Sequence, residues 1–71
     1  MIRISGNKIK DIVEGVDGQV IEGIKYESTG PIKGISATFN HDNPDEELAK
    51  ATLKKYIKTA YPVLRVYVEI V

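Results

Sequence analysis

The chain lacks several residue types that mark particular classes of protein. Its 71 residues include no cysteine and no tryptophan, and only one histidine. The absence of cysteine excludes disulfide bonds, thiolate metal sites and thiol nucleophiles. Because small extracellular domains are often cross-linked by disulfides, it also favours an intracellular protein.

Long apolar runs are missing as well. No segment approaches the ~20 apolar residues that cross a membrane, and the first residues lack the apolar stretch of a signal peptide. We therefore expect a cytoplasmic protein that has no membrane contact.

Neither sign of charge is in excess. Ten lysine and arginine residues are balanced by ten aspartate and glutamate residues, which gives a formal net charge of zero. No overall field then attracts polyanions, and little repulsion keeps copies of the chain apart. The hydrophobic fraction of 42% is typical of a globular protein, and 71 residues suffice for one core, so we expect a single domain over residues 1–71.

A helix is expected from Pro44 to Ala60. Asn43 suits the cap position, Pro44 the first helical position, and Glu46 stands three residues after the cap, as in a capping box. Pro62 cannot continue the helix and biases its predecessor away from helical geometry. The apolar stripe of this helix consists of Leu48, Ala49, Thr52, Leu53, Tyr56, Ile57 and Ala60. One side of the helix should therefore lie on a sheet.

The remaining chain is interpreted as strands. Asp17-Gly18 favours a two-residue hairpin between residues 11–16 and 19–28, because type I′ turns need positive φ at both central residues. A second turn is expected at residues 28–31. Further strands are predicted over residues 1–5 and 32–40, the latter with Ile35, Ala37 and Phe39 on one face and with Gly34 as a bulge or a point of close approach. Residues 7–16 also fit helical spacing, but their β-branched residues favour a strand.

The last nine residues form the most unusual segment. Alternation places Leu64, Val66, Val68 and Ile70 on one face of a strand and Val63, Arg65, Tyr67, Glu69 and Val71 on the other. Both faces are thus largely apolar, and one helix can cover only one of them. Either a partner covers the second face or the sheet curves into a partial barrel that buries it.

These elements predict an α+β fold in the order β-β-β-β-α-β. The sheet is expected to have four to five mostly antiparallel strands, with one amphipathic helix on one face. The strands before and after the helix should run parallel to each other through a right-handed crossover.

The sequence contains no group of residues with the spacing of a catalytic site. His41, Asp42, Asn43, Asp45 and Glu46 concentrate polar ligands before the helix, but cap, turn and dipole roles explain them better than a metal site. We therefore expect no catalytic residues, no metal and no cofactor. A small-ligand pocket between the sheet and residues 40–43 is a weaker alternative.

The expected function is that of a small non-enzymatic interaction or regulatory protein, of a kind that suits an accessory protein of bacteria or viruses. It would self-associate, preferably as a dimer, or bind another protein through its sheet. The predicted interface residues are Val63, Arg65, Tyr67, Glu69 and Val71. The alternative is nucleic-acid binding through the outer face of the helix, where the candidate contacts are Lys50, Lys54, Lys55 and Lys58.

Overall fold

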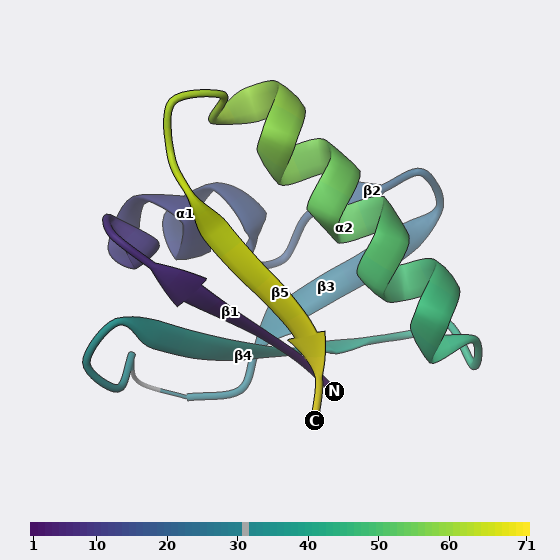
Figure 1. The fold of residues 1–71 in the computed structure, drawn as a ribbon. Helices are drawn as coiled ribbons and strands as arrows, with labels where there is room; N and C mark the ends of the chain where they lie inside the picture. Colours follow the sequence, from purple (N-terminus) through teal and green to yellow (C-terminus); the bar gives the residue numbers. More distant parts are fainter. Residues whose placement is uncertain (31) are drawn as a thin grey trace.

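The computed structural model of the protein describes residues 1–30 and 32–71. Along these residues the elements are β1 (Ile2–Gly6), α1 (Ile9–Val16), β2 (Val20–Ile21), β3 (Ile24–Ser28), β4 (Ser36–His41), α2 (Glu46–Ala60) and β5 (Val66–Ile70) (Figure 1). The predicted α+β class is confirmed. The second predicted turn, at residues 28–31, ends on Pro31, which lies outside the described residues.

The strands form one five-stranded sheet in the order β2-β3-β4-β1-β5. Every neighbouring pair is antiparallel. Because β4 and β5 both pair with β1, they run parallel to each other, as expected for the strands that flank the long helix. The sequence did not show that the first strand would lie between them, in the interior of the sheet.

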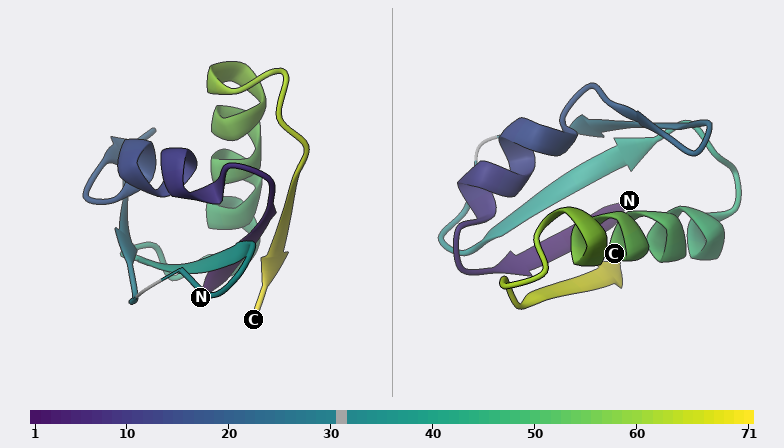
Figure 2. Two further views of the ribbon diagram at one scale, coloured as in Figure 1. Left: turned by 90° about the vertical axis from the view of Figure 1, so that its left-hand side faces the viewer. Right: turned by 90° about the horizontal axis from the view of Figure 1, so that it is seen from above.

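Both helices lie on the same face of the sheet (Figure 2). Between the helices and the sheet is one apolar core, to which every strand contributes. Its largest fully buried side chains are Tyr26, Phe39, Ile2, Ile4, Ile12, Leu53 and Val16. Each such side chain stabilises the fold by roughly 1.5–3 kcal/mol relative to an exposed one.

The prediction of a strand over residues 7–16 was wrong, because residues 9–16 form the helix α1. A helix brings Ile9, Ile12 and Val16 to one side, where all three are buried, whereas a strand would have pointed Ile9 and Ile12 to opposite faces. Asp17-Gly18 ends this helix instead of forming a hairpin, and the N–H of Asp17 donates to the carbonyl of Val13.

The tight hairpin occurs five residues later than predicted, between β2 and β3. Glu22 and Gly23 form its turn, with φ values of 49° and 80°. Positive φ at both central residues is what a type I′ turn requires. The predicted kind of turn, with positive φ at both central residues, is therefore present, but it lies at Glu22-Gly23 and not at Asp17-Gly18.

The start of the long helix also differs from the prediction. α2 begins at Glu46, and the carboxylate of Asp45 caps it by accepting a hydrogen bond from the N–H of Leu48 at 3.1 Å. Asn43 does not cap the helix itself; its side-chain oxygen accepts a hydrogen bond from the N–H of the capping residue, Asp45, at 2.7 Å. The helix ends at Ala60, as predicted.

β4 is shorter than the predicted strand over residues 32–40. Ala37 and Phe39 face the core as expected, but Ile35 is exposed. Gly34 has a φ of 61°, and the backbones of Lys33 and Ser36 are joined by two hydrogen bonds around it. Gly34 therefore lies in a tight turn before the strand, not in a bulge within it.

Candidate functional site

β5 forms one edge of the sheet, and among the described residues no strand lies beyond it. The N–H of Val71 donates to the carbonyl of Met1, on the β1 side, at 3.0 Å. Hydrogen-bonded pairs alternate along an antiparallel ladder, so every second residue of β5 directs its backbone groups to β1. The others direct their N–H and C=O groups away from the sheet: Val66, Val68 and Ile70.

Two contacts with β1 fix the position of β5. Gly6 has a φ of 152°, and a Cβ at this position would collide with the carbonyl oxygen of Arg65. Only glycine therefore allows the start of β5 to lie so close to β1. On the outer face of the sheet, the guanidinium of Arg3 donates to the Glu69 carboxylate, with an Nε–Oε1 distance of 2.6 Å.

The predicted interface residues lie near this edge, but they do not form one apolar sheet face. Val63 belongs to the loop before β5, because the strand begins at Val66 and not at residue 63. Val63 is 89% exposed, Tyr67 82% and Val71 53%. The alternative of a partial barrel that buries the second face is thus excluded for Tyr67. Arg65 and Glu69 flank Tyr67 at alternate positions of the chain.

The outer face of the sheet is mostly polar around Tyr67. The residues that pair on this face include Arg3 with Thr38, Ser5 with Ser36 and Glu27 with Asn40. The uncovered apolar surface expected for the last strand is therefore confined to that strand, because the other strands present polar side chains there. What remains uncovered is the edge of β5 together with Tyr67.

A groove of about 440 Å³ runs along this open edge, between β5 and α2. α2 supplies Lys54, Ile57 and Lys58, and the other side is lined by residues 64–68. Because consecutive residues of a strand point to opposite faces, a lining of five consecutive residues shows that the groove follows the backbone edge. α2 extends alongside β5 in both the front view and the view from above (Figures 1 and 2).

The four lysines predicted to contact nucleic acid do not all line the same hollow. Lys54 and Lys58 line the groove beside β5, whereas Lys55 lines a separate hollow with Ile21 and Tyr56. Lys50 precedes Lys54 by one helical turn. Arg65, which the prediction did not include in this group, joins Lys54 and Lys58 at the groove.

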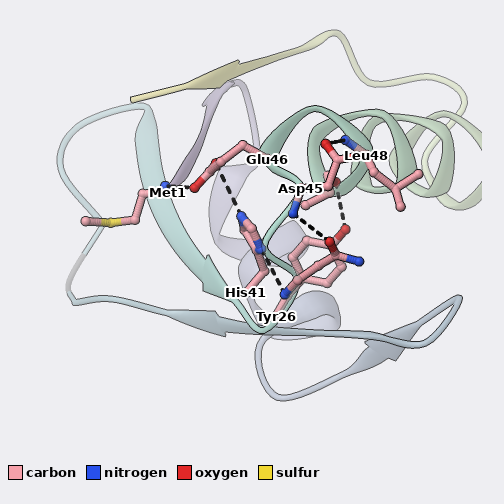
Figure 3. A network of polar contacts seen from close by, with 8 residues as sticks. Met1, Tyr26, His41, Asp45, Glu46 and Leu48 are labelled. Carbon is pink, nitrogen blue, oxygen red and sulfur yellow. Dashed lines mark hydrogen bonds and ion pairs between the residues drawn. The ribbon is translucent and has the colours of Figure 1, made fainter.

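A second polar cluster surrounds His41 at the beginning of α2 (Figure 3). The imidazole Nε2 lies 3.3 Å from a carboxylate oxygen of Glu46, and the amino group of Met1 donates to the other oxygen at 2.8 Å. The hydrogen bond from this amino group lowers the pKa of the Glu46 carboxyl below its usual value, and the adjacent imidazole of His41 adds to the shift. These contacts fasten the helix start to β1 and β4.

Tyr26 connects the same region to the core. Its hydroxyl donates to the carbonyl of Ala49 in α2 at 2.7 Å. Burial raises the pKa of this hydroxyl to about 12, and the nearby charges of Asp42 and Glu22 add to the shift. The cluster of Tyr26, His41 and Glu46 is thus explained by its structural contacts.

Other kinds of site find little support in the structure. In the described part of the chain, no three histidine, cysteine or acidic side chains are grouped so that they could hold a metal ion. The hollow near residues 40–43 is small, about 200 Å³, and is lined by Lys25, Glu27, Asn40, His41 and Asp42. None of the helices along residues 1–30 and 32–71 has the length and apolar character needed to cross a membrane.

Comparisons with protein-family models, with curated proteins and with solved structures find no match for this chain. The candidate site is therefore defined by its own geometry: the open edge of β5, the groove beneath α2 and the exposed ring of Tyr67. Sequence reasoning identified Tyr67 but missed the groove, because the path of α2 along β5 depends on the tertiary fold.

Proposed function

We propose that the protein is a small non-enzymatic interaction protein, which self-associates by pairing β5 of one copy with β5 of a second copy. The open backbone edge of β5 is the observation that carries this proposal. An exposed edge strand offers a row of unpaired N–H and C=O groups to another strand. A second copy carries the same edge, so a twofold arrangement pairs the free N–H and C=O groups of both copies at once.

The charges of β5 favour one register of this pairing. An antiparallel pair centred on Tyr67 places Arg65 of each copy opposite Glu69 of the other. A pair centred on Glu69 would place two carboxylates opposite each other, which is destabilising. A pair centred on Val68 would leave Arg65 opposite the apolar Val71. Only the first register joins opposite charges.

The same register also places apolar side chains opposite each other on the other face of β5. With Tyr67 at the centre, Val66 lies opposite Val68 of the second copy, and Leu64 lies opposite Ile70. Two Tyr67 rings then meet at a non-hydrogen-bonded pair, where side chains approach most closely. Aromatic cross-strand pairs contribute roughly 0.2–1 kcal/mol each. Both faces of β5 are therefore complementary to themselves in one and the same register.

Such an interface is small, because only one short strand of each copy takes part. Interfaces below about 1,200 Å² are usually transient. We therefore expect a dissociation constant on the order of micromolar, which corresponds to about 8 kcal/mol of binding free energy.

Analytical ultracentrifugation tests this proposal at protein concentrations from about 1 to 200 µM, which span the expected dissociation constant. The native chain should shift from monomer to dimer, and both Tyr67→Lys and Ile70→Pro should remain monomeric. Val20→Lys is the matched control, since Val20 is 64% exposed at the opposite edge of the sheet. A native chain that stays monomeric throughout, or equal loss of the dimer in Val20→Lys, contradicts the proposal.

A second candidate is nucleic-acid binding, which the grouping of Arg65 with Lys54 and Lys58 supports. Three neutralised phosphates would give a plot of log K against log salt a slope of roughly −2 to −3. Retention of a single-stranded or double-stranded oligonucleotide at low salt, with this slope, would support it. No binding at about 50 mM salt, where contacts to phosphates are still strong, would exclude this candidate.

A further inference from the structure

The groove beside β5 carries a charge pattern that a second copy of the chain does not match. Its polar rim consists of Lys54 and Lys58 on α2 and of Arg65 just before β5, and none of the side chains that line it is acidic. Its floor is apolar, with Ile57 and Val68 among its residues. In the described part of the chain, neither lysine is engaged in an ion pair.

The spacing of the two lysines matches the repeat of a β-strand. Lys54 and Lys58 are one helical turn apart, which corresponds to about 6 Å along the axis of α2. In a strand, side chains on the same face are spaced by two residues, or about 6.6–6.8 Å. Because α2 runs alongside β5 (Figure 1), a strand added to the open edge would meet one lysine with every second side chain.

We infer that the groove binds an extended acidic segment of another protein, with carboxylates at alternate residues facing Lys54 and Lys58. This inference rests on the proposed function, since the segment would add to the same edge of β5. A second copy would bring Val66 and Val68 to these positions, which leaves the lysines without an opposite charge. The acidic segment therefore competes with self-association and favours the monomer.

The backbone of β5 distinguishes a peptide from a nucleic acid at this site. Val66 and Val68 offer both N–H donors and C=O acceptors along the groove, and Ile70 continues the same row of free groups beyond it. An added strand uses both kinds of group, whereas a phosphate backbone can only accept hydrogen bonds. Both an acidic peptide and a nucleic acid can pair with the cationic rim, but only the peptide also pairs with the backbone of the strand edge.

Fluorescence anisotropy with a labelled seven-residue peptide of alternating glutamate and valine tests this inference. The same peptide with lysine in place of glutamate is the control ligand. The native chain should bind the glutamate peptide at least tenfold more tightly than the lysine peptide. Lys54→Glu/Lys58→Glu should reverse this preference, while Lys10→Glu, an exposed position on α1, should preserve it.

Reversal of the preference shows that the double variant is folded and that charge at the groove selects the ligand. Ile70→Pro should abolish binding of either peptide, because its ring blocks the edge. Equal binding of the two peptides, binding unaffected by Ile70→Pro, or displacement of the peptide by an equimolar single-stranded oligonucleotide would overturn the inference.

Sedimentation of the chain with and without the peptide separates this inference from the proposed function. A peptide-free chain that is monomeric but binds the glutamate peptide would refute self-association alone. A chain that forms dimers, and that the peptide neither binds nor dissociates, would refute the acidic ligand alone. If both hold, the glutamate peptide should convert the dimer to monomer and the lysine peptide should not.

Discussion

The two edges of the sheet differ in how far they are open to another strand. β2, at one edge, has two residues and ends in the tight turn of Glu22 and Gly23. β5, at the other, has five residues, an exposed aromatic ring and a groove along its backbone. Soluble proteins commonly protect edges by keeping them short. One edge is thus kept too short for extensive pairing, whereas the other leaves the backbone groups of a five-residue strand open.

The two edges are also fastened to the rest of the fold in different ways. On the β2 side, the hydroxyl of Tyr26 joins β3 to α2 through a buried hydrogen bond. On the β5 side, α2 contacts the strand beside an open groove, and a glycine of β1 permits the close approach of Arg65. Changes at matched positions of the two edges should therefore have unequal effects.

The largest difference is expected between two glycine substitutions. Gly6→Ala should lower the free energy of unfolding by about 2–4 kcal/mol, because the methyl group meets the backbone of β5 and the φ is unfavourable. Gly23→Ala, in the β2 hairpin, has free space around its Cβ and should cost only about 1 kcal/mol of strain. Urea unfolding measures both, and equal losses would contradict the close approach at β5.

A pair of proline substitutions tests which backbone groups of β5 are free. Glu69→Pro should destabilise the protein by about 2 kcal/mol, because it removes a hydrogen bond to β1 and the ion pair with Arg3. Ile70→Pro should cost less than about 1 kcal/mol, since an N–H that points away from the sheet is not lost from a ladder. The opposite order in urea unfolding would show that the register is shifted by one residue.

Alkaline pH should destabilise the protein through the buried hydroxyl of Tyr26, on the β2 side of the molecule. The pKa of Tyr26 is raised from 10.0 to about 12 in the fold, so the stability linked to its proton is present below pH 10 and is lost as pH rises toward 12. Tyr26→Phe should cost about 1 kcal/mol at neutral pH, through the lost hydrogen bond. It should also remove this part of the alkaline decline, and unfolding measured between pH 8 and about 11 would detect it.

The smallest expected effect concerns the charge pairs of the proposed dimer. Arg65→Glu and Glu69→Lys should each weaken self-association, because each variant places like charges opposite each other. A mixture of the two variants restores both pairs, and its dimer should be favoured by about 1 kcal/mol over either homodimer. Sedimentation of the separate and mixed variants measures this, and a mixture that associates no better would exclude the register centred on Tyr67.

The sequence predicted the elements with strong local signals and missed those that depend on distant contacts. The long helix ends at Ala60 as expected, because Pro62 acts locally. The spacing of residues 7–16 fits a helix, but their β-branched residues favoured the prediction of a strand. The helix forms because it buries Ile9, Ile12 and Val16 on one side. Propensity is a weak guide where tertiary packing decides.

The same distinction applies to the candidate site. Tyr67, with Arg65 and Glu69 beside it, could be identified from alternation alone. The groove could not, because it requires β1 to lie between β4 and β5 and α2 to run along the edge. The polar surroundings of Tyr67 come from other strands of the sheet, so they also depend on which strands lie beside β5.

By itself the sequence determined the α+β class, the end of α2 and the alternating pattern of the last strand, because caps, prolines and side-chain periods act within a few residues. The tertiary structure decided which strand lies in the middle of the sheet, which edge stays open and which lysines face it. These depend on how one apolar core is shared among elements far apart in the chain, and the free energy of that shared burial is not a property of any single segment.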